Sequence, residues 1–230
     1  MKKLPPARDQ DIGDALVESV GATEALDVIK DLGEVALDSA LDEGTLRDLP
    51  VIGWVFGGAR VVRQLKDRLF LKKLAAFLTP ISRVSPEARR EFMNRMNADP
   101  RFKQRVGDGL VLLLDRHEHF EKSEVLGLVF RVLIRNEIGF DLYQTAATVI
   151  DRASTNDFKH LASQSDSGAA LKDEVGQALT SIGAATSKHT LVHHTSEDGF
   201  YTSIGRDVSV SYELNVTGKL LSSVLRDWGT

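Results

Sequence analysis

The chain has 230 residues, of which 42% are hydrophobic and 27% are charged, and its formal net charge is −4. These fractions are ordinary for a soluble globular protein and exclude a disordered chain or a polytopic membrane protein. Cysteine is absent, which excludes disulfide frameworks, thiolate zinc sites and cysteine nucleophiles and favours a reducing compartment. The opening MKKLPPARDQD lacks the apolar stretch of a signal peptide. We therefore expect a cytoplasmic protein.

The net charge hides three regions of different sign. By count, residues 1–50 carry about −7, residues 51–105 about +9 and residues 106–230 about −6. A basic region between acidic flanks first suggests pairing within the chain, with the N-terminal helices folded over the basic region. An external anion, either a nucleic acid or a lipid head group, is the second interpretation.

The acidic N-terminal region has the pattern of two helices. Residues 11–31 place apolar side chains at helical intervals with acids on the other face, and Gly21 and Gly33 weaken or end this element. A second short helix is expected at residues 35–44, closed by Gly44.

The segment 50–78 is the expected centre of the fold. Its apolar positions fall on one side of a helix up to Leu69 and on nearly the opposite side from Phe70 to Leu78. The segment is therefore predicted either to lie between two layers of the fold or to break near Arg68.

The same segment carries the candidate binding residues. Gly53 and Gly57 are four apart, the spacing that lets two helices approach closely. A tight turn or a buried helix crossing is the first interpretation, and contact with a membrane surface is the second. About a dozen apolar residues precede the arginines, fewer than the roughly twenty that a span requires. The candidate residues for binding a protein partner or an anionic membrane are Gly53, Trp54, Val55, Phe56, Gly57, Arg60, Arg63, Lys66 and Arg68.

Two helix starts follow with strong local signals. Ser85 before Pro86 and Glu87 predicts an N-cap, a first-turn proline and a first-turn acid. Asp99 before Pro100 repeats this device and opens a helix of about sixteen residues. Apolar helices are then expected at about residues 123–136 and after Gly139, with short connections.

A resemblance rests on four strings of this region. They are PVIGWVFGGARVVRQLKDRLFLKKLAAFL, VSPEARREFMNRM, LVLLLDRHEHFEKSEVLGLVFRVLI and FDLYQTAATVIDR. Together they resemble a group of small helical proteins of bacteria and their prophages, for which no activity is established. The resemblance covers about residues 36–152. It implies a helical fold and a prophage or phage-defence setting.

The sequence pattern changes after Ser154. We expect a helical bundle over residues 1–164 and a separate module over residues 165–230. A helix is followed by two alternating segments, 190–195 and 208–214, with a long glycine-containing turn between them, and by a closing helix. This order resembles the C-terminal part of winged-helix modules. The predicted fold class is therefore mainly α, a multi-helical bundle with a small C-terminal α+β, winged-helix-like module that contains a β-hairpin.

The histidines near residue 117 are weak candidates for metal ligands. In DRHEHFEKSE, the spacing of four from Asp115 to His119 and from His117 to Glu121 would suit one helix face. A helix end with a solvated loop, whose histidines cap exposed carbonyls, is the leading interpretation. We therefore expect no metal and no other cofactor.

These patterns favour a non-enzymatic interaction protein. No nucleophile elbow and no phosphate-binding loop is present, so no catalytic residue is assigned. The leading partner is a second protein or another copy of the chain, followed by an anionic membrane surface at the inner face. The alternative is a nucleic-acid-binding regulator that uses the winged-helix-like module, with backbone contacts from Arg83, Arg89, Arg90 and Arg95.

Overall fold

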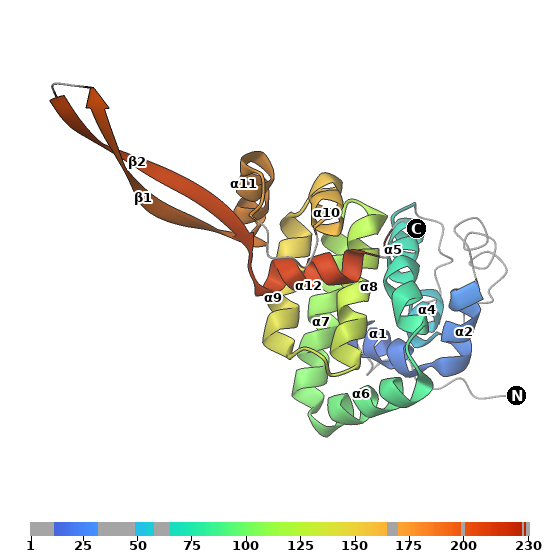
Figure 1. Cartoon of the computed structure of the whole chain (residues 1–230). Helices are drawn as coiled ribbons and strands as arrows, with labels where there is room; N and C mark the ends of the chain where they lie inside the picture. Colours follow the sequence, from blue (N-terminus) through green and yellow to red (C-terminus); the bar gives the residue numbers. More distant parts are fainter. Residues whose placement is uncertain are drawn as a thin grey trace, which may run out of the picture. The chain divides into compact units, whose positions relative to one another are not determined.

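Figure 1 shows a helical N-terminal part followed by a smaller part that carries a long β-hairpin. The computed structural model describes residues 12–31, 49–57, 65–164, 170–198, 201–226 and 228. The chain divides into a first unit, residues 1–151, and a second unit, residues 152–230. The expected fold class, mainly α with a small α+β module containing a hairpin, is confirmed.

The first unit is helical throughout its described residues. Its elements are α1 (Ile12–Gly21), α2 (Thr23–Asp31), α4 (Pro50–Gly57), α5 (Leu65–Ser82), α6 (Pro86–Ala98), α7 (Pro100–Arg116), α8 (Phe120–Ile134) and α9 (Phe140–Arg152). The helix expected at residues 35–44 lies outside the described residues.

The acidic N-terminal helices pack directly on the basic region. Helix α1 lies against α7, and α2 lies against α5. Lys103 Nζ of α7 pairs with Glu18 Oε1 of α1 at 3.1 Å. This contact is an instance of the charge pairing within the chain that the sequence suggested.

The described residues of the segment 50–78 belong to two helices. They are α4, over Pro50–Gly57, and α5, which runs from Leu65 past the expected end to Ser82. The alternative of a break near Arg68 is wrong, because α5 continues through that residue. Pro80 lies inside its last turns and removes one backbone hydrogen bond. The helix continues because Ile81, beyond the proline, is fully buried, and burying such a side chain contributes more than one hydrogen bond costs.

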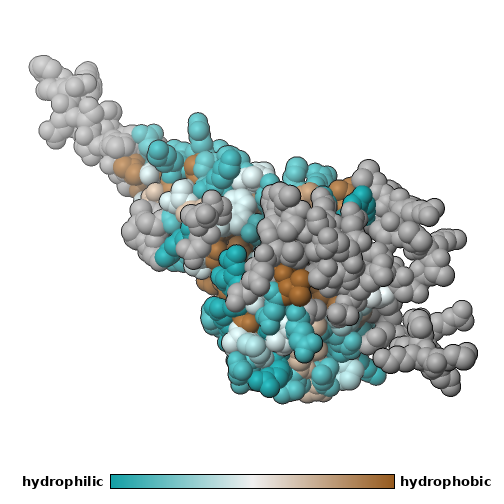
Figure 2. Space-filling model, turned by 90° about the vertical axis from the view of Figure 1, so that its right-hand side faces the viewer, coloured by the Kyte–Doolittle hydropathy of each residue, from teal (hydrophilic) through white to brown (hydrophobic). Residues whose placement is uncertain are grey.

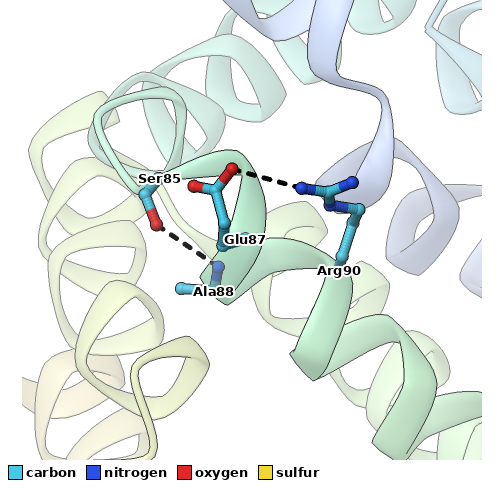
Figure 3. Close-up of polar contacts among 4 residues, drawn as sticks. All are labelled: Ser85, Glu87, Ala88 and Arg90. Atoms are coloured by element: carbon cyan, nitrogen blue, oxygen red, sulfur yellow. Dashed lines mark hydrogen bonds and ion pairs between the residues drawn. The ribbon is translucent and has the colours of Figure 1, made fainter.

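The two predicted helix starts are confirmed, at α6 and α7. Ser85 Oγ accepts the Ala88 N–H at 3.3 Å, and Arg90 pairs with Glu87 at 3.1 Å on the exposed side of the same turn (Figure 3). An Asp99 carboxylate oxygen accepts the Phe102 N–H at 3.0 Å. Such caps satisfy amide groups that the helix itself leaves unpaired.

The core of the first unit forms around α5 and α8. Gly127 of α8 lies so close to the backbone of Phe77 in α5 that a Cβ would overlap it. Phe130 is fully buried, and its ring lies 5.4 Å from the rings of Phe77, Phe92 and Tyr143, centroid to centroid. Helices α5, α6, α8 and α9 each contribute one ring to this aromatic cluster.

Tyr143 places a hydroxyl group in that cluster. The oxygen is buried and has no hydrogen-bond partner in the described structure, and burial raises the pKa of the phenol. We expect Tyr143→Phe to stabilise the protein by about 1 kcal/mol, because it removes a polar group that was desolvated without compensation. Urea unfolding followed by circular dichroism measures the change. A loss of stability of similar size would contradict the assignment.

The second unit places a β-hairpin between helices. Its elements are α10 (Thr155–Ala162), α11 (Asp173–Ile182), β1 (Ala185–Asp198), β2 (Tyr201–Leu214) and α12 (Val216–Leu225). Ser154 and Asp157 form a capping box at the start of α10. Because α10 packs on α12, the boundary between the units falls at 151/152, earlier than the 164/165 expected from the sequence.

The hairpin is longer than the sequence suggested. The two strands are antiparallel and pair without interruption from Ala185↔Leu214 to Asp198↔Tyr201. The prediction of a long turn between residues 195 and 208 is therefore wrong. Only residues 199 and 200 lie between the two strands. Alternation identifies a strand with one buried face, whereas this hairpin is exposed on both faces over much of its described length.

Candidate interaction surfaces

The segment expected to bind a partner is largely used inside the first unit. Val51 and Ile52 of α4 are buried, and the Val51 N–H donates to Ser19 Oγ of α1 at 3.1 Å. In α5, the buried side chains include Leu74 and Phe77, and the helix contacts both α2 and α8. Both ends of the segment 50–78 are therefore internal parts of the fold.

The candidate binding residues of this segment are only partly described. Gly53 is half-buried in α4, and Arg68 and Leu69 are exposed on α5. The other candidates lie outside the described residues or belong to those whose side chains are not described: Trp54, Val55, Phe56, Gly57, Arg60, Arg63 and Lys66.

The four arginines considered for nucleic-acid binding all belong to the first unit, but they differ in accessibility. Arg89 is 1% exposed, and burial lowers the pKa of its guanidinium group. Arg90 is exposed and pairs with Glu87, whereas Arg95 donates to the Ile134 carbonyl at 3.1 Å. Arg83 is also exposed. The four residues therefore do not form one accessible basic surface.

His117 and His119 lie in different environments. His117 is 1% exposed, and its Nδ1 lies 3.1 Å from Ser123 Oγ of α8. His119 is exposed at the N-cap of α8. Within the described ranges there is no group of three or more potential ligands of the His, Cys, Asp and Glu types. His119 is exposed, as expected for a solvated loop, but it makes no side-chain capping hydrogen bond, and the burial of His117 was missed.

Cations surround His117. Lys73 Nζ donates to the Asp115 carbonyl at 2.9 Å, and Lys122 Nζ donates to the Asp151 carbonyl at 2.7 Å. Arg116 pairs with the Asp151 carboxylate at 2.7 Å. The two lysines bind backbone carbonyls at the ends of α7 and α9, and Arg116 binds a side-chain carboxylate. They connect α5, α7, α8 and α9, so this cluster stabilises the fold.

Burial is the main cause that lowers the pKa of His117 to about 4. Asp151 acts in the opposite direction, and the positive charges of Lys122, Lys73 and Arg116 lower the pKa further. The imidazole is therefore neutral at physiological pH.

The β-hairpin of the second unit, called the ribbon below, presents exposed apolar side chains. Among its described side chains, those at the base are packed, and Tyr212 is buried against α11 at Gly176. Farther along, Leu191 is 65% exposed and Val208 is 60% exposed. Figure 2 shows apolar surface, in brown, next to hydrophilic surface on the described part of the ribbon.

The strand register gathers these apolar residues on one face. Leu191 pairs with Val208, and His189 pairs with Val210. Residues directly opposite each other, and residues two apart along a strand, share a face of an antiparallel pair. His189, Leu191, Val208 and Val210 therefore form one stripe, called the apolar stripe below. The other face is more polar: the described pairs Lys188↔Ser211, Thr190↔Ser209 and Val192↔Asp207 belong to it.

The ribbon has no excess of positive charge. Over residues 185–214, Lys188 and Arg206 stand against four acids, which are Glu197, Asp198, Asp207 and Glu213. A surface that binds phosphates normally carries unopposed positive charge. The sequence of the ribbon does not have this excess.

No helix in the described ranges is long and apolar enough to cross a membrane. Comparisons of the chain with protein-family models, with curated proteins and with solved structures found no match.

Proposed function

We propose that this protein is a non-enzymatic interaction protein that binds another protein through the ribbon of its second unit. The observation that carries the proposal is the exposed apolar stripe, in which Leu191 and Val208 are 65% and 60% exposed. A two-stranded ribbon is marginally stable by itself, and exposed apolar side chains on such a ribbon are typical of surfaces that a partner covers.

The segment 50–78 is a second candidate surface in this proposal. Arg68 and Leu69, exposed on α5, support it, and a partner protein or an anionic membrane would be the ligand. In the membrane version, vesicles rich in anionic lipid should sediment the protein at low salt, and Trp54→Glu should abolish the effect. Absence of sedimentation would remove that version.

The cellular setting is likewise part of the proposal. A cytoplasmic protein is supported by the lack of cysteine. A prophage or phage-defence context is supported by the sequence resemblance alone. A nucleic-acid role is not proposed, because the ribbon is acidic and Arg89 is buried.

Photo-crosslinking in bacterial cells tests the ribbon directly. A photoreactive amino acid at Leu191 should give a crosslinked product of defined mass, which mass spectrometry identifies. The matched control carries the same amino acid at Thr190, an exposed neighbour whose side chain lies on the other face. We expect little product from Thr190 and loss of the Leu191 product in a Val208→Lys background. No product at Leu191, or equal products at both positions, would overturn the proposal.

A further inference from the structure

We draw no further inference here: the strongest candidate, the apolar stripe around Leu191 and Val208 on one face of the ribbon, belongs to the surface already described, and nothing in the described structure shows what covers it.

Discussion

Gly107→Ala is expected to destabilise the first unit by about 2–3 kcal/mol. Gly107 of α7 lies against Gly13 of α1, and a Cβ on Gly107 would overlap the Gly13 backbone. Backbone atoms cannot rotate away as a side chain can, so the two helices must separate and lose the packing between them. The helix propensity gained by alanine, about 1 kcal/mol, is smaller than this loss.

Gly109→Ala is the matched control, two residues farther along the same helix. Nothing lies within 4 Å of a Cβ at Gly109, so this variant should be stabilised by up to about 1 kcal/mol. Urea unfolding in a Trp228→Phe background leaves Trp54 as the one tryptophan, which restricts the fluorescence signal to the first unit. Equal effects of the two substitutions would contradict the close approach of α1 and α7.

Lowering the pH from about 6.5 to about 4 is expected to remove up to about 3 kcal/mol of stability through His117 alone. The pKa of this residue is lowered from 6.5 to about 4 in the folded protein. Below pH 6.5 the unfolded chain therefore binds a proton that the folded chain excludes, and stability falls as the pH falls. The contribution is fully present above pH 6.5 and is lost by about pH 4.

His117→Gln should flatten this part of the pH profile, since glutamine does not titrate. The control is His119→Gln, which changes an exposed histidine two residues away and should leave the profile parallel to that of the unaltered protein. Urea midpoints measured at several pH values between 4 and 7.5 provide the comparison. Parallel profiles for all three proteins would show that His117 is not held neutral in the fold. The comparison uses the slope of the urea midpoint against pH. A substitution that changes stability equally at every pH therefore does not affect the result.

Local signals in the sequence predicted several elements well. Ser85 with Pro86, and Asp99 with Pro100, mark helix starts because each cap acts through atoms within three residues of it. The strongly apolar stretch at residues 123–136 predicted a helix, and most side chains of α8 are buried. The near-continuous apolar stretch in the second half of α7 also suggested a central position, but Leu112 there is 65% exposed. The capping box of Ser154 and Asp157 was also readable by the same rule.

Other features depend on residues that are distant in the sequence. The helix through Pro80 continues because of burial that the local pattern does not reveal, and the meeting of Gly13 with Gly107 joins residues on different helices. The burial of His117 requires α5, α8 and α9 around the end of α7. Its histidine-rich context suggested a solvated loop instead, because hydrophilic sequence normally indicates exposure.

The ribbon separates the two kinds of information most clearly. The β-branched segments by themselves determined that a hairpin forms near the C-terminus, because strand propensity and alternation act over a few residues. Only the tertiary structure decided that the strands are fourteen residues long and that, among the described side chains of the ribbon, Tyr212 at the base is packed while Leu191 and Val208 are exposed. Burial is a property of the whole fold. An apolar face has the same sequence pattern whether the core of the same protein or another molecule covers it.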